Sequence, residues 1–139
     1  MRVYTLVMKT PCYCLALRAA ARKATALYDE TLAPAGLNLA QYGLMRRIER
    51  AGAVSLTELG RMAELDRSTV GRNVKVLERL QLVRLAPAKD QREAAVGLTP
   101  AGSEALRRAA PLWQDAQRRV ETALGAGGAE QLRALALSL

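Results

Sequence analysis

The feature that most constrains the fold is a pair of short amphipathic helices joined by a tight turn, within residues 55–80. In the stretch STVGRNVKVLERL, residues 68–80, apolar side chains recur at helical spacing, so one face is expected to be buried. The helix before it begins with a capping box, in which Ser55 and Glu58 are expected to satisfy each other's main-chain amides. Asp66 is expected to cap the second helix. Two such helices, the second basic on its outer face, are typical of a helix-turn-helix.

A β-hairpin is expected directly after the second helix, because the apolar period changes from helical to alternating. Residues 83–86 alternate apolar and polar side chains, and residues 94–98 form a second short strand candidate. With the charged loop between them, these strands predict a wing at 83–98. Together with a further helix expected over 39–50, residues 38–98 are predicted to form a winged helix-turn-helix.

A long helix is predicted on the N-terminal side of this unit. Residues 12–33 contain no proline or glycine, and Pro34 and Gly36 follow, so the segment 12–36 is expected to be one helix with its terminator. Alanine and leucine side chains are spaced to line one face of this helix. A small domain cannot bury that face, which predicts that it pairs with a second copy of the chain.

The C-terminal segment 100–139 is predicted to be helical as well. Thr99 followed by Pro100 is typical of a helix start, and a bend is expected near Pro111. The predicted fold class is mainly α with a small β-wing: a winged helix-turn-helix plus N- and C-terminal dimerisation helices, in a single domain over 1–139.

Composition and charge narrow the classes of partner. The chain has 139 residues and a formal net charge of +8 at pH 7, which suits a polyanion such as nucleic acid. Residues 54–98 contribute only +2 of this charge, so specificity must come from where their charges lie. Two cysteines are too few for a secreted disulfide scaffold, and the chain has no signal-peptide pattern or long apolar run. We therefore expect a cytoplasmic protein without membrane contact.

The outer face of the second helix supplies the candidates for DNA recognition. A recognition helix lies in the major groove with its N-terminal half against base edges, where arginine can pair with guanine and asparagine with adenine. The candidates in this half are Ser68, Thr69, Arg72 and Asn73. The candidates for phosphate contacts are Arg61, Arg67, Lys75, Arg79 and Arg84. On the wing loop, Lys89 and Arg92 can reach the minor groove. Gly71 either allows a close approach to the DNA backbone or packs against the preceding helix.

Several motifs resemble those of MarR-type winged helix-turn-helix repressors. They are LTEL at 56–59, DRSTV at 66–70, LERLQLVR at 77–84, DQR at 90–92 and LTPAG at 98–102. With the flanking helices, the resemblance covers nearly the whole chain. It implies an obligate homodimer with intertwined terminal helices, and an Arg92 side chain that enters the minor groove while Asp90 holds it. An ordinary exposed ion pair is the alternative for these two residues. The chain departs from the family at Gln81, where the family usually has glycine.

The resemblance also implies a small organic effector, bound between the dimer helices and the helix-turn-helix. An arginine there would suit a carboxylate, and effectors of this family are often aromatic. The candidate lining residues are Arg18, Arg22, Tyr28, Tyr42 and Met45. Trp113 is expected to be a packing residue near the dimer seam, with a ligand contact as the alternative.

The two cysteines allow two interpretations. Cys14, together with Tyr28 on the same helix, resembles a segment of the organic-hydroperoxide-sensing branch of the family, and a helix start favours a thiolate. Alternatively, Cys14 is a small buried hydrophobe in the dimer seam and Cys12 is incidental. The chain has no histidine, so a thiol enzyme lacks a good general base and a metal site lacks ligands. No catalytic residue, metal or cofactor is expected.

The sequence therefore predicts a sequence-specific DNA-binding transcription regulator and not an enzyme. Its expected partners are double-stranded DNA, a second copy of the chain and a small effector that releases a homodimeric repressor from a pseudo-palindromic operator. Two alternatives stay open: a thiol-based peroxide-sensing repressor that acts through Cys14, and an architectural DNA-binding protein without a regulatory ligand.

Overall fold

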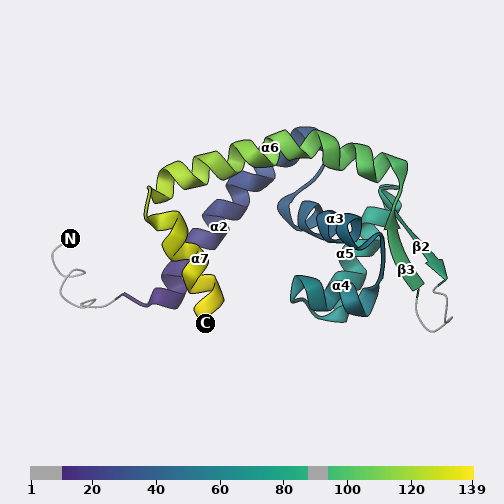
Figure 1. Cartoon of the computed structure of the whole chain (residues 1–139), viewed down its shortest axis with the longest axis horizontal. Coiled ribbons are helices and arrows are strands. Elements are labelled where there is room, and N and C mark those ends of the chain that lie inside the picture. Colours follow the sequence, from purple (N-terminus) through teal and green to yellow (C-terminus); the bar gives the residue numbers. More distant parts are fainter. Residues whose placement is uncertain (1–10, 88–93) are drawn as a thin grey trace.

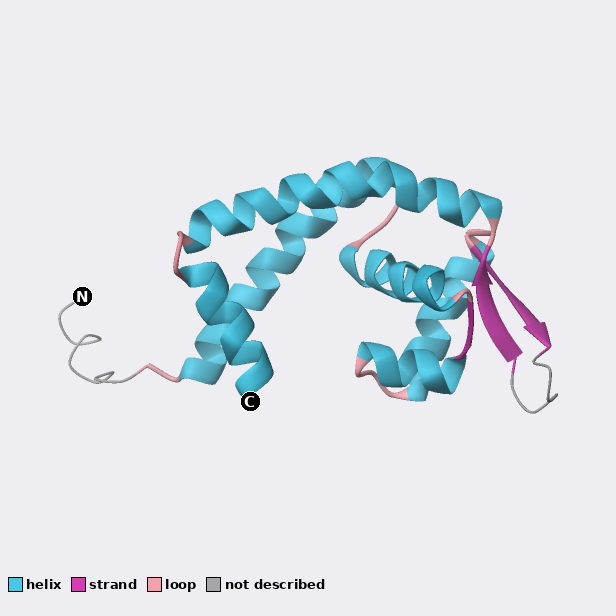
Figure 2. Cartoon of the chain, in the orientation of Figure 1, coloured by secondary structure: helices cyan, strands magenta, loops and turns pink. Residues whose placement is uncertain are grey.

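A computed structural model of the chain describes residues 11–87 and 94–139. Helices dominate, and a small sheet lies at one end of the molecule (Figures 1 and 2). In chain order the elements are α2 (Tyr13–Leu32), the 3-10 turn η1 (Ala33–Ala35), α3 (Leu39–Ala51), β1 (Ala53–Ser55), α4 (Leu56–Ala63), α5 (Arg67–Arg79), β2 (Val83–Pro87), β3 (Ala94–Leu98), α6 (Pro100–Leu124) and α7 (Gly128–Ser138). This is the predicted winged helix-turn-helix with long helices on both sides.

The sheet contains one strand more than the sequence predicted. β1 joins the expected hairpin, and the antiparallel order is β1-β3-β2. Val96 in the central strand lies opposite Val54 on one side and Leu85 on the other. Val54 and Val96 are buried, so the three residues of β1 attach the sheet to the core directly before α4 begins.

One core holds the helix-turn-helix, the sheet and the first half of α6 together. Its largest fully buried side chains come from α3, α4, α5 and the sheet, and Leu32 joins them from the end of α2. Leu106 on α6 also lies in this core. The first half of α6 therefore belongs to the winged helix-turn-helix unit.

The starts of α3 and α4 are capped in different ways. The full capping box forms at α3, where the Asn38 side chain accepts from the Gln41 amide and the Gln41 side chain accepts from the Asn38 amide, both at 2.9 Å. At α4, only half of the predicted box forms. The Ser55 hydroxyl oxygen accepts from the Glu58 amide at 3.1 Å, but the Glu58 carboxylate pairs with Arg61. A basic neighbour one turn along the helix competes successfully for that carboxylate.

The helices α2 and α7 and the second half of α6 form the other end of the molecule (Figure 1). α6 begins at the expected Thr99 cap, continues as one helix through Pro111 and arches over the rest of the chain (Figure 1). α2 packs against α6, with a hydrogen bond from the Tyr28 hydroxyl to the Gln117 side chain. Among the residues of α2, only Leu32 is buried.

No helix within residues 11–87 and 94–139 combines the length and the apolar character that crossing a membrane requires.

Candidate DNA-binding interface

The turn between α4 and α5 closes without the glycine that such turns often contain. Glu64 takes the left-handed conformation instead, with φ 55°. The Leu65 amide donates to the Gly60 carbonyl at 2.9 Å, and the Glu64 amide donates to the Arg61 carbonyl at 3.3 Å. These two bonds define a Schellman motif, which turns the chain sharply after a helix. A Cβ atom on Gly60 would lie 2.9 Å from the Leu65 carbonyl oxygen, so glycine is needed inside α4.

α5 presents a continuous polar stripe on the side opposite the core. Its buried side chains are Val70, Val74 and Leu77. The exposed stripe consists of Ser68, Arg72, Lys75 and Arg79. Steps of four, three and four residues place these side chains on one helix face. Three cations and a hydroxyl group on one exposed face match the contacts that a helix makes in a DNA groove.

Other candidates on α5 do not belong to this exposed stripe. Asn73 is half-buried and lies on the flank of α5, beside the buried face. Arg67 is exposed at the first position of the helix. A Cβ atom on Gly71 would meet nothing within 4 Å, so packing against α4 does not explain this glycine, and the surface there is open to a close approach.

Asp66 organises the N-terminus of α5. It occupies the predicted cap position, but its carboxylate accepts from the hydroxyl groups of Ser68 and Thr69 and makes no capping bond to a main-chain amide. The Arg72 guanidinium in turn donates to the Thr69 hydroxyl oxygen at 3.2 Å. The Ser68 and Thr69 hydroxyl groups lower the pKa of Asp66 from 3.8 to about 2. These bonds connect three candidate base-reading side chains, Ser68, Thr69 and Arg72, before DNA is present.

The end of α5 repeats the geometry of the turn before it. Gln81 takes φ 61°, the Gln81 amide donates to the Glu78 carbonyl at 2.9 Å, and the Leu82 amide donates to the Leu77 carbonyl at 3.0 Å. This is a second Schellman motif, and its left-handed residue is Gln81, at the position where the family usually has glycine. The helix closes in the ordinary way, but with a residue that favours this conformation less than glycine does.

The remaining candidates for DNA contacts lie outside α5, on α4, on β2 and on the wing loop. Arg84 lies exposed on β2, and Arg61 lies exposed on α4 beside Glu58, which raises the pKa of Arg61. The wing-loop candidates Lys89, Asp90 and Arg92 lie outside the described residues. Their predicted contacts with the minor groove stay predictions.

A pocket of about 530 Å³ lies between α3, the end of α4 and α6. One wall is formed by Tyr42 and Trp113, whose rings stack with centroids 6.1 Å apart. The other lining residues are Leu39, Gly43, Arg46, Arg47, Arg50 and Met62. The lining therefore combines two aromatic rings with three guanidinium groups and contains no carboxylate.

Of the five predicted effector residues, only Tyr42 lines this pocket. Met45 is fully buried in the core. Arg18 and Arg22 are exposed on α2, and Tyr28 lies where α2 packs on α6, so the structure does not bring the five together.

The arginines of α3 were missed, although their spacing could have revealed them. Tyr42, Arg46 and Arg50 recur every four residues, which places them on one face of a helix. Burial and the nearby Glu49 raise the pKa of Tyr42, and Arg46 and Arg50 oppose that shift.

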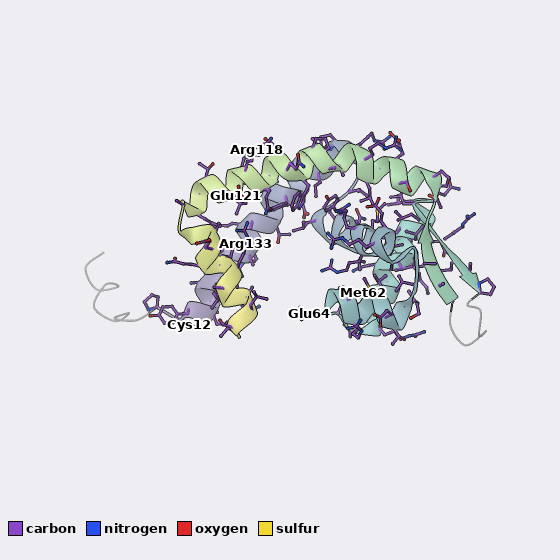
Figure 3. All side chains as sticks on the ribbon, viewed as in Figure 1. Cys12, Met62, Glu64, Arg118, Glu121 and Arg133 are labelled. Carbon is purple, nitrogen blue, oxygen red and sulfur yellow. The ribbon has the colours of Figure 1, made fainter. Side chains whose placement is uncertain are left out.

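Both cysteines are exposed at the start of α2, and Cys12 immediately precedes its first residue. Figure 3 shows Cys12 at one end of the molecule and Met62 and Glu64 together at the end of α4, far from it. In the described part of the chain, no three histidine, cysteine, aspartate or glutamate side chains form a group that could hold a metal.

Comparison with known proteins gives consistent results. A model of the MarR family matches residues 35–93. The chain is similar to a probable transcriptional regulator from Pseudomonas aeruginosa, with 26% identity and a TM-score of 0.82 over 88% of this chain and 92% of that one. It is similar to the M. tuberculosis transcriptional regulator MosR in complex with DNA, with 31% identity and a TM-score of 0.80 over 93% and 100%. A mutant MarR from E. coli complexed with operator DNA shares the fold, with 23% identity and a TM-score of 0.80 over 86% and 87%. Comparison with curated protein sequences found no match.

Proposed function

The chain belongs to the MarR family of DNA-binding transcription regulators, and we propose that it is a homodimeric repressor of a pseudo-palindromic operator. In this proposal α5 of each subunit enters the major groove, and the two half-sites lie about one DNA turn apart. The observation that carries the proposal is the exposed stripe of Ser68, Arg72, Lys75 and Arg79, opposite the buried face of α5. The protein acts as a cytoplasmic regulator and not as an enzyme.

Dimerisation is supported by apolar side chains at the ends of the chain. Leu15 on α2 is 64% exposed and Leu137 on α7 is 89% exposed. Although α2 packs against α6, a helix of this length with one buried residue leaves much of its apolar surface exposed in the single chain. A second copy that pairs its terminal helices with these would bury that face.

Release by a small ligand is supported by the pocket beside α3. Its stacked Tyr42 and Trp113 offer an apolar wall to a flat ring, and Arg46, Arg47 and Arg50 offer donors to a carboxylate. An aromatic carboxylate therefore fits the lining. The pocket is lined by α3, α6 and Met62 in the last turn of α4, so an occupant would contact the helix that directly precedes the turn to α5.

Selection of duplexes from a random pool, followed by footprinting, tests this function. We expect an inverted repeat to be enriched, protection over two half-sites, and a dimer in sedimentation measurements. The selected duplex should bind roughly 10³-fold or more tightly than a random duplex at the same salt concentration. Equal affinity for both would favour the architectural alternative, and protection of one half-site by a monomer would contradict the dimer.

Thiol-based sensing is the second candidate, and the exposure of both cysteines favours it. Oxidation of Cys14, in this alternative, strains α2 and moves the DNA-binding units apart. The test replaces both Cys12 and Cys14 with serine. Loss of a peroxide response with unchanged operator affinity would support sensing, and an unchanged peroxide response would dismiss it.

A further inference from the structure

Arg47 connects the pocket to the helix-turn-helix through a single side chain. Its Nε donates to the main-chain carbonyl of Met62 at 3.2 Å, and its Nη1 donates to the carbonyl of Gly43 at 3.0 Å. Gly43 lies on α3, on the same helix as Arg47, whereas Met62 lies in the last turn of α4. The guanidinium group therefore links α3 to the end of the helix that precedes the turn.

The carbonyl that Arg47 binds is one that α4 cannot satisfy by itself. The last four carbonyls of a helix lack partners within the helix. In α4, the Gly60 carbonyl accepts from Leu65 and the Arg61 carbonyl accepts from Glu64. Arg47 supplies the donor for the next carbonyl, that of Met62. A cation at this position also interacts favourably with the negative end of the helix dipole.

The geometry of the turn depends on this end of α4. Glu64 holds a left-handed conformation two residues after Met62, and α5 starts at Arg67. Figure 3 labels both residues at this end of the molecule. A shift of the Met62 carbonyl therefore moves the turn and, with it, the N-terminal half of α5.

The same guanidinium group lines the pocket with Arg46 and Arg50. A carboxylate forms a stronger hydrogen bond with arginine than a main-chain carbonyl does, because both partners are charged. An anion in the pocket would therefore compete with Met62 for Arg47.

We propose that Arg47 is a positioning residue for DNA recognition, which holds the turn between α4 and α5 in place and through which an anion in the pocket loosens that turn. The second half rests on the proposed function, because it makes Arg47 the route from effector to DNA. The first half concerns the free protein alone.

Two charge-conserving variants separate this role from a general effect of charge. Arg47→Lys keeps the cation but cannot make both bonds of the guanidinium group. Arg46→Lys is the matched control: Arg46 also lines the pocket, but it pairs with Glu49 at 2.8 Å and makes no bond to α4. Arg47→Gln, which removes the charge, provides a second test at the same position.

Hydrogen exchange in the free protein tests the positioning role. The amides of Glu64 and Leu65 report on the turn, because both are bonded within it. We expect Arg47→Lys to accelerate their exchange roughly 3- to 10-fold, as loss of one hydrogen bond would, and Arg46→Lys to leave it unchanged. Wild-type exchange at these amides in both Arg47 variants would overturn the proposal.

DNA binding and a simple anion complete the test. We expect Arg47→Lys to lower the affinity for the selected duplex and to leave the affinity for a random duplex unchanged; equal losses on both duplexes would overturn the role in recognition. Benzoate should accelerate exchange of the Glu64 and Leu65 amides in the wild type but not in Arg47→Lys. Benzoate that fails to bind, or binds without this effect, overturns the coupling. Failure to select any duplex would instead refute the proposed function, and exchange in the free protein would still decide the positioning role.

Discussion

The hydroxyl group of Thr99 donates a 2.7 Å hydrogen bond to the main-chain carbonyl of Gln81. This bond connects the residue before α6 to the turn that follows α5, although the strands β2 and β3 separate the two helices in the chain. The Thr99 amide donates to the neighbouring Leu82 carbonyl at 3.1 Å, and the Thr99 hydroxyl oxygen also accepts from the Gly102 amide at 3.0 Å. One threonine thus caps α6 and connects it to the residues directly after α5. The orientation of α5 and the start of α6 are therefore fixed together.

Gln81→Gly is expected to stabilise the protein. Gln81 holds φ 61°, a conformation that costs a residue with a side chain about 1–2 kcal/mol, and glycine adopts it freely. Part of this gain is lost because glycine has more freedom in the unfolded chain, so we expect a net increase of about 0.5–1 kcal/mol in the free energy of unfolding. Urea denaturation at a fixed protein concentration measures it. Glu78→Gly, inside α5 one turn earlier, is the control and should destabilise by about 1 kcal/mol.

Gly102→Ala is expected to destabilise the protein strongly. A Cβ atom at Gly102 would overlap the main-chain carbonyl oxygen of Leu82, and neither backbone can move without breaking the Thr99 bonds. We expect a loss of about 1–3 kcal/mol, the range for overpacking. Gly71→Ala is the matched control, because nothing lies within 4 Å of its added atom; it should gain up to about 1 kcal/mol. Equal effects of the two substitutions would contradict the packing argument.

Most of the fold could be predicted because its signals are local. Helix periods, the Thr99-Pro100 start and the change to alternation at Val83 each depend on neighbouring residues, and the structure confirms those elements. β1 could not be predicted from Ala53, Val54 and Ser55, since three residues define no period and this strand exists only by pairing with β3. Tertiary contact, and not local preference, creates it.

The site was predictable where one helix contains it. The exposed stripe of α5 follows from the spacing of Val70, Val74 and Leu77, whose buried positions fix the opposite face. The pocket residues come from three elements, and a list of arginines and tyrosines on separate helices cannot say which ones meet. Arg47 was missed for this reason, because its partner is the Met62 carbonyl, a main-chain group that no sequence pattern identifies.

Asp66 is expected to make the stability of the protein depend on pH in the acid range. Its pKa is lowered from 3.8 to about 2, chiefly by the Ser68 and Thr69 hydroxyl groups, so the folded chain favours the ionised form. The stabilisation is therefore complete above pH 3.8 and is lost as the pH falls toward about 2. Urea midpoints across this range should fall more steeply for the wild type than for Asp66→Asn, which cannot ionise. Parallel curves would show that the hydroxyl groups do not hold the carboxylate.

Lys75 and Arg72 are expected to make different contributions to DNA binding, although both lie on the exposed stripe of α5. Lys75 lies past the middle of the helix, where we expect it to contact a phosphate. Lys75→Ala should weaken all duplexes alike and lower the slope of log affinity against log salt by about 0.9 per lost contact, or about 1.8 for a dimer.

Arg72 lies in the N-terminal half, with its guanidinium already bonded to Thr69. Arg72→Ala should reduce the free energy of binding to the selected duplex by about 1–3 kcal/mol per half-site. Binding to a random duplex should lose only the electrostatic contribution of one positive charge. Arg107→Ala removes the same charge from α6, where Arg107 pairs with Glu104. This control should change neither the affinity for the selected duplex nor the salt slope. Titrations of both duplexes at several salt concentrations measure all three variants. If Arg72→Ala and Lys75→Ala have the same effect on both duplexes, the N-terminal half of α5 does not read base edges, and recognition must lie in the wing.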